Sequence, residues 1–230
     1  MRLARKAGAE FVGTFFVTLV AIGVDVAFFT GAGADYVSRW LARGFITTAM
    51  IFAFSVVSGA HVDPAVSLAF AIRKDMPAAQ MLLYWIAQFA GGFGAAAAGL
   101  ALWGSAMALG ASHPGPHVGQ LEAAIVETLL TFLLVLVILA TADAEATVGK
   151  QSAIAIGFVV AACGFFAGPV SGASMNPARS IPAQLLTGTF DLAWIYAVGP
   201  CAGAALAALA ATFFFPRPTP GERKAGTGEG

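Results

Sequence analysis

Long apolar runs with few charged residues alternate with short polar segments along most of the chain. A helix that crosses roughly 30 Å of hydrocarbon needs about 20 mostly apolar residues. Six runs are long enough, at residues 8–30, 40–58, 78–103, 119–141, 151–169 and 192–215. The pattern predicts an all-α membrane protein with six transmembrane helices in a lipid bilayer.

The composition supports this fold class and excludes several others. Of the 230 residues, 59% are hydrophobic and only 10% are charged, whereas soluble domains contain roughly 25% charged residues. Disorder and an ordinary water-soluble enzyme are therefore not expected. The formal net charge is zero, so no bulk field would attract nucleic acid. The two cysteines lie in apolar stretches and indicate neither a disulfide framework nor a metal site.

Basic residues are distributed unevenly between the two sides of the predicted bundle. With the N-terminus inside, nine lie on the inner side: Arg2, Arg5, Lys6, Arg73, Lys74, Lys150, Arg217, Arg223 and Lys224. The other three are Arg39, Arg43 and Arg179. Because cytoplasmic segments are enriched in arginine and lysine, we expect both termini in the cytoplasm. Abundant alanine and glycine with short loops favour a bacterial inner membrane, and the polar tail 216–230 is expected to be disordered.

An internal repeat relates the two halves of the chain. Residues 58–65 (SGAHVDPA) match residues 171–178 (SGASMNPA) at an offset of 113, and Glu10 matches Glu127 at an offset of 117. Matches at about half the chain length indicate a duplicated unit. Each half contains three predicted spans, so the second half must enter the membrane from the opposite side. We expect one channel domain made of two inverted repeats, at about residues 5–110 and 115–215.

The matched segments each precede a stretch that is too short to cross the bilayer, at residues 65–73 and 178–187. Each stretch follows a good N-cap and a proline, which suits the first helical turn: Asp63-Pro64-Ala65 and Asn176-Pro177-Ala178. Two half-helices that dip in from opposite faces would meet near the midplane. Irregular backbone at that depth requires surrounding protein or a water-filled path, so the pattern predicts a pore.

At these residues the sequence resembles the aquaporin, or major intrinsic protein, family. The resemblance rests on the two boxes at half-chain spacing, on Arg179-Ser180 after the second box, on the Glu10 and Glu127 pair, and on Gln88 with Gly91-Gly92. It implies six spans and two re-entrant half-helices. It also implies a homotetramer with one pore per subunit, which passes water or small neutral permeants and excludes ions and protons. No cofactor is implied.

The resemblance and elementary electrostatics assign roles to the two box residues. Each half-helix N-terminus carries about half a positive charge, so two that face one point repel cations, and the Asn176 amide can donate to a passing molecule. Asp63 replaces the family's asparagine. An ionised Asp63 would partly cancel the dipoles and favour an ion or proton leak, whereas a cap whose charge the backbone donors absorb would not. We favour the cap.

The resemblance also places a selectivity filter at Arg43, Gly164, Ala173 and Arg179. Small residues at 164 and 173 predict a filter wider and less polar than that of water-only members, although Gly164 could simply allow close helix packing. Arg43 replaces an aromatic or small residue. An Asp25–Arg43 ion pair beside the pore is our preferred interpretation, while snorkelling to the surface and a true filter position stay open.

Three further residues complete the candidate site. For Glu10 and Glu127 we expect the family's role of supporting the pore loops, in preference to proton relay. His61 precedes Asp63 by two residues and is expected to line the inner vestibule. The HPGPH segment at residues 113–117 is expected to be a solvated loop, so no metal site is predicted.

The resulting functional prediction is a passive channel for water and small uncharged solutes such as glycerol, urea or neutral metalloid hydroxides, including arsenite. Ser180 stands where dedicated glycerol channels carry aspartate, and some metalloid channels combine that serine with a small-residue filter. The alternative is a water-selective channel that Arg43 narrows. An ion- or proton-conducting pore, which Asp63 raises, ranks lower. An enzyme or a structural junction protein also ranks lower, because the sequence shows no catalytic constellation.

Overall fold

The computed structural model describes residues 2–141, 151–214 and 223, so part of the predicted tail and the segment 142–150 lie outside the described residues. Six helices in the described part are long and apolar enough to cross a membrane, as predicted. They are α1 (Arg2–Phe29), α2 (Tyr36–Ser58), α4 (Ala78–Trp103), α5 (Gln120–Thr141), α6 (Ser152–Ser171) and α8 (Ala193–Phe214). Short 3-10 turns η1 (Gly104–Gly110) and η3 (Phe190–Leu192) precede α5 and α8.

Two boundaries differ from the sequence prediction for identifiable reasons. Helix α1 begins before the apolar run, because basic side chains are good helix formers and its first residues need not lie in the hydrocarbon. Helix α2 begins at Tyr36 because Asp35 forms a capping box with Ser38. The hydrogen bond that the Asp35 carboxylate accepts from the Ser38 backbone lowers the pKa of Asp35.

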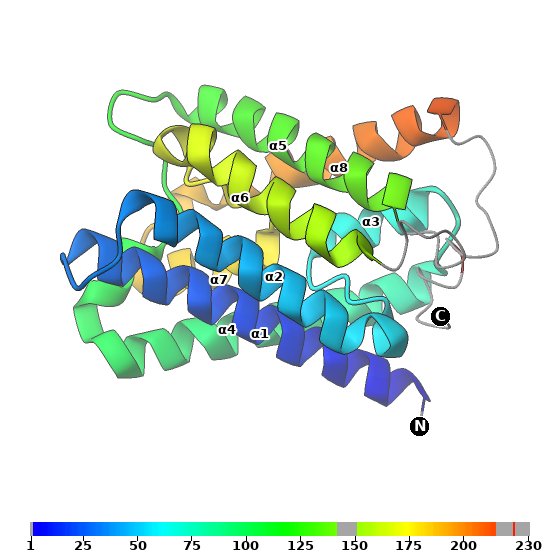
Figure 1. Ribbon diagram of the computed structural model, residues 1–230, viewed down its shortest axis with the longest axis horizontal. Coiled ribbons are helices and arrows are strands. Elements are labelled where there is room, and N and C mark those ends of the chain that lie inside the picture. The colour runs from blue at the N-terminus through cyan, green and yellow to red at the C-terminus, as the bar shows by residue number, and fades with distance from the viewer. Residues whose placement is uncertain (1, 142–150, 215–222, 224–230) are drawn as a thin grey trace.

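The two short helices are present where the proline boxes predict them. Helix α3 spans Pro64–Ile72 and α7 spans Pro177–Thr187. In Figure 1, α3 lies toward the end of the bundle where the N-terminus is found, and α7 lies toward the opposite end. Helix pairs α1–α4 and α5–α8 pack in equivalent ways in the two halves, and α2 packs against α6 between them.

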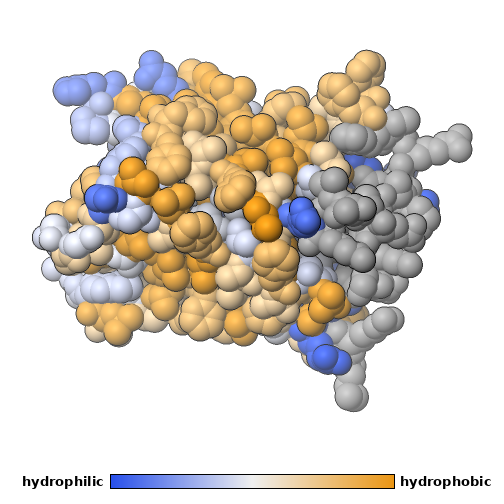
Figure 2. Space-filling model, in the orientation of Figure 1, coloured by the Kyte–Doolittle hydropathy of each residue, from blue (hydrophilic) through white to orange (hydrophobic). Residues whose placement is uncertain are grey.

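Apolar side chains face outward over the middle of the bundle, while several polar side chains are buried inside. Figure 2 shows a hydrophobic band between two ends that carry hydrophilic side chains. Large apolar residues that are more than half exposed include Phe45, Ile86, Leu129 and Phe158. Glu10, Gln88 and Glu127 are fully buried. This distribution suits a protein whose solvent at mid-depth is lipid.

Glycines allow the close helix contacts that the fold requires. A Cβ on Gly91 would lie 2.4 Å from the Phe11 carbonyl oxygen, and a Cβ on Gly203 would lie 2.3 Å from the Thr128 carbonyl oxygen. Backbone atoms cannot move aside as a flexible side chain can. The α1–α4 and α5–α8 contacts therefore depend on residues that lack a side chain, as expected where lipid provides no hydrophobic driving force.

Candidate pore and outer constriction

Helices α3 and α7 begin at two capped ends that lie on one cavity. Asp63 accepts a hydrogen bond through Oδ1 from the Ala65 backbone at 2.8 Å. Asn176 accepts through Oδ1 from Ala178 at 2.9 Å and from Arg179 at 3.2 Å. The caps explain why each short helix starts at its proline.

The Asn176 side chain also joins the two halves of the chain. Its Nδ2 donates to the Val62 carbonyl oxygen, which lies in the first loop, at 2.9 Å. An asparagine amide carries two N–H groups, so one donor is committed to the other half. The second is available to a molecule in the cavity, which Asn176 lines.

The loops before α3 and α7 share an unusual backbone. Non-glycine residues adopt positive φ at Ala60 (49°) and Val62 (48°), and at the matched Ala173 (41°) and Met175 (56°). Such conformations cost of order 1–3 kcal/mol each and persist only when neighbouring contacts enforce them. The repeat seen in the sequence is therefore also a repeat of backbone geometry.

Glu10 and Glu127 supply those contacts in equivalent ways. Glu10 accepts from the backbone N–H groups of His61 (2.9 Å) and Val62 (2.6 Å). Glu127 accepts from Ser174 (2.9 Å) and Met175 (2.7 Å). This is the geometry that loop support requires. The first half adds a bond from Gln88 Nε2 to Glu10 Oε2 at 2.7 Å.

A serine and a tyrosine in each half add further hydrogen bonds to the pore loop. Ser58 donates to Glu10 at 2.6 Å and Ser171 donates to Glu127 at 2.7 Å. The Tyr84 and Tyr196 hydroxyls donate to the carbonyl oxygens of these same serines, at 2.6 and 2.7 Å. Each pore loop is thus fixed from its own half of the chain.

The cavity has a volume of about 480 Å³ and passes both caps. It extends from Ser55 and Ser152, near the C-terminal end of α2 and the N-terminal end of α6, to Arg43 and Arg179 at the other end. Ala173 and His61 also line it. His61 is held by a contact of 3.0 Å between Nδ1 and the Ser67 hydroxyl, and its ring stacks on Phe70 at 4.6 Å.

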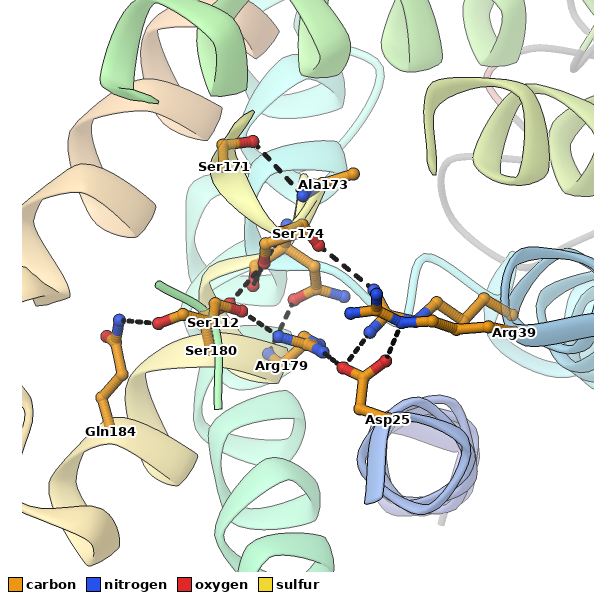
Figure 3. A network of polar contacts seen from close by, with 12 residues as sticks. Asp25, Arg39, Ser112, Ser171, Ala173, Ser174, Arg179, Ser180 and Gln184 are labelled. Atoms are coloured by element: carbon orange, nitrogen blue, oxygen red, sulfur yellow. Dashed lines mark hydrogen bonds and ion pairs between the residues drawn. The ribbon is translucent and has the colours of Figure 1, made fainter. Parts of the chain in front are cut away.

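Four charged side chains meet at the Arg43 end of the cavity, as Figure 3 shows in part. One oxygen of Asp25 accepts from Arg39 Nε at 2.5 Å. The other oxygen accepts from Arg43 and, at 3.1 Å, from Arg179. We call Asp25, Arg39, Arg43 and Arg179 the arginine cluster. Arg43 therefore pairs with Asp25 and lines the cavity at the same time, which combines two of the placements left open above.

The arginine cluster is fixed to the surrounding backbone and hydroxyl groups. Arg43 Nη1 donates to the Gly172 carbonyl oxygen at 3.2 Å. Arg179 donates to the hydroxyl of Ser112, which also contacts the hydroxyl of Ser180. Gln184 donates to the Ser112 carbonyl oxygen at 2.8 Å. The segment before α5 thus orients Arg179.

Gly164 requires a correction, because it is not among the residues that line the described cavity. A Cβ on Gly164 would lie 2.0 Å from Cε3 of Trp40, so the indole ring covers this position. The guanidinium carbons of Arg39 and Arg43 lie 4.6 and 4.3 Å from the centre of the Trp40 ring. Because residue 164 has no side chain, the Trp40 ring can pack against it, and the ring in turn contacts the two arginines.

Sequence reasoning missed Arg39, Trp40 and Ser112 as members of this region. Arg39 precedes Arg43 by four residues, so both lie on one face of a helix, and this spacing was the available signal. Nothing local in the sequence marks Ser112. Within the described residues, no three histidine, cysteine, aspartate or glutamate side chains gather as they would around a metal ion.

Comparison of the sequence and the fold with known proteins identifies the family to which the chain belongs. Residues 1–211 match the family described as Major intrinsic protein. The chain belongs to the major intrinsic protein family. It is 37% identical over 224 residues to aquaporin NIP2-1 of Oryza sativa subsp. japonica, covering 96% of this chain and 74% of that protein.

The chain is also similar to a second relative and, in fold, to a solved structure. The lens fiber major intrinsic protein of Lithobates pipiens is 38% identical over 220 residues, covering 93% of this chain and 82% of that protein. The solved structure of the aquaglyceroporin from Plasmodium falciparum superposes with a TM-score of 0.82 at 22% identity, covering 93% of this chain and 98% of that one. The fold class predicted from the sequence is confirmed, and the chain is an integral membrane protein.

Proposed function

We propose that this protein is a passive channel that conducts water and small uncharged solutes down their gradients. The observation that carries the proposal is the cavity past Asp63 and Asn176, where the positive ends of α3 and α7 meet. Two such ends repel cations. The free N–H of Asn176 donates to a permeant oxygen. Glycerol, urea and neutral metalloid hydroxides such as arsenite fit this chemistry, since they are uncharged and carry hydrogen-bonding groups.

A water-selective channel is the second candidate, and a specific observation favours it. Trp40 fills the space beside Gly164 that the wide-filter hypothesis left open. Arg43 adds a second guanidinium to the lining near Arg179. A filled position 164 and a second guanidinium in the lining both argue against a wide, apolar filter, which favours the water-selective candidate.

Orientation and assembly belong to the same proposal. The three arginines assigned to the outer side all pair with Asp25. The excess of arginine and lysine on the other side, nine against three, supports both termini in the cytoplasm. We further propose a homotetramer, as the family resemblance implies. The prediction of a bacterial inner membrane rests on composition alone, and the relatives, from Oryza sativa and Lithobates pipiens, do not support it.

Stopped-flow light scattering of protein in liposomes tests the function directly. An impermeant osmolyte reports water flux through the rate of shrinkage, and glycerol reports solute flux through the reswelling that follows. Fast shrinkage with fast reswelling supports the solute channel. Fast shrinkage without reswelling supports the water-selective candidate. Rates equal to those of empty liposomes in both osmolytes would reject the channel proposal.

A further inference from the structure

The arginine cluster carries more positive charge than its own carboxylate neutralises. Asp25 is the carboxylate that pairs with Arg39, Arg43 and Arg179 in the described part of the chain. None of the four residues is more than 8% exposed. Three guanidinium groups against one carboxylate leave two positive charges in excess, and uncompensated buried charge is strongly unfavourable.

Only part of this excess charge reaches the cavity. Arg43 and Arg179 are cavity-lining residues, whereas Arg39 is not among them. Arg39 is held away by its contacts with Asp25 and with the rings of Phe28 and Phe29, which lie 5.0 and 4.9 Å from its guanidinium carbon. The charge that a molecule in the cavity encounters is therefore that of Arg43 and Arg179.

Both cavity-lining arginines retain hydrogen-bonding capacity. A guanidinium has five N–H donors. Arg43 donates to Gly172 and Asp25, and Arg179 donates to Ser112 and Asp25. These contacts use one N–H of each terminal nitrogen, and the Nε atoms of both are buried without a partner. A ligand with negative charge and more than one acceptor oxygen matches the N–H groups that remain on the terminal nitrogens.

We propose that the outer end of the cavity binds a small oxyanion, of the size and planarity of formate or nitrate, between Arg43 and Arg179. Charge-assisted bonds from arginine to a planar oxyanion are short and can be bidentate. The bound anion offsets the excess charge of the arginine cluster. Because it lies at the constriction, it also slows the passage of water. This site is additional to the proposed conduction of neutral solutes, and its binding can be measured without any flux.

The first measurement is thermal unfolding of the purified full-length protein in detergent, titrated with sodium formate. Formamide serves as the uncharged analogue of the same shape, and a bulky sulfonate salt maintains the ionic strength. Saturable stabilisation by formate and nitrate, but not by formamide, supports the site. Equal melting temperatures in formate and formamide would overturn it.

Two variants that remove the same charge locate the site. Arg43→Gln removes a cavity-lining guanidinium, and Arg39→Gln removes one that does not line the cavity. We expect Arg43→Gln to raise the half-saturating formate concentration by about tenfold, and Arg39→Gln to raise it by less than about threefold. Equal effects of the two variants would overturn the placement in the cavity.

Water permeability provides the second readout. In liposomes that contain the wild-type protein, formate should reduce the rate of osmotic shrinkage with the same half-maximal concentration as in the unfolding titration. Shrinkage rates that do not respond to formate would overturn the claim that the anion lies at the constriction. If Arg43→Gln does not fold, the wild-type titrations in formate and formamide still decide whether the anion binds.

Discussion

The indole ring of Trp40 occupies the space that a side chain on residue 164 would need, since a Cβ on Gly164 would lie 2.0 Å from Cε3 of Trp40. The same ring supports the guanidinium groups of Arg39 and Arg43. The packing of α2 against α6 therefore positions the guanidinium groups of Arg39 and Arg43. The first two predictions follow from this contact.

Gly164→Ala is expected to destabilise the protein by about 1–3 kcal/mol, because the added methyl group overpacks a filled site. A fall in melting temperature measures this effect. Ala162→Leu, on the exposed side of the same helix, is the control and should leave the melting temperature nearly unchanged. An equally stable Gly164→Ala would contradict the contact with Trp40.

Trp40→Ala is expected to widen the outer constriction and to raise the ratio of glycerol to water permeability severalfold. Loss of the buried ring should also cost about 3–5 kcal/mol of stability. Trp40→Phe, which keeps an aromatic face under the arginines, is the milder variant and should widen the pore less. An unchanged permeability ratio in a folded Trp40→Ala protein would refute a filter role for the indole.

Glu127→Gln is expected to lower stability by about 1–3 kcal/mol, because a side-chain amide would face one backbone donor of the second loop with another donor. Glu10→Gln should cost more, since Glu10 also accepts from Gln88. Thermal unfolding compares the two with Asp191→Asn, which neutralises an exposed carboxylate. If both glutamate variants matched that control, the loop-support role would fail.

Asp63→Asn is expected to preserve the cap of α3, since Asn176 caps α7 through the same atom type. Water permeability should therefore remain close to that of the wild type. Voltage clamp of bilayers containing each protein tests the leak hypothesis at the same time. A wild-type current that follows one ion's gradient and disappears in Asp63→Asn would show that the carboxylate admits ions.

Gly203→Leu is expected to prevent assembly without altering the lining of the pore, because its Cβ would lie 2.3 Å from the Thr128 carbonyl oxygen. Size-exclusion chromatography with light scattering measures the oligomer. Leu206→Ala, at a half-exposed position on the same helix, provides the comparison. Normal oligomers of Gly203→Leu would contradict the assignment of residue 203 to the α5–α8 contact.

Local signals explain how much of the fold could be predicted. Asp63 and Asn176 predict the starts of α3 and α7, because an N-cap followed by proline is a signal contained in two residues. The six spans are also predicted by a local signal, the length and apolarity of each run. The predicted start of α1 is too late, because an apolar run shows which residues can lie in the membrane and does not show where the helix begins. The helix extends toward the N-terminus through Lys6 and Arg5.

The constriction was harder to predict because its geometry depends on contacts between distant residues. Trp40 and Gly164 are 124 positions apart in the sequence, and no spacing rule relates them. A glycine at residue 164 is equally consistent with an open filter and with a position against which another side chain packs. Asp25 could be paired with Arg43 by depth in the membrane, but depth alone could not show that Arg39 and Arg179 share the same carboxylate.

The support of each pore loop has a consequence for how the chain could be divided. Glu10 and Tyr84 hold the first loop, and Glu127 and Tyr196 hold the second. A break in the segment between Gly110 and Gln120 would leave each of these bonds within one fragment. Each fragment would carry the means to shape its own half of the channel, and the α2–α6 surface would remain to bring the fragments together. The protein is in this sense two folding modules that share one permeation path.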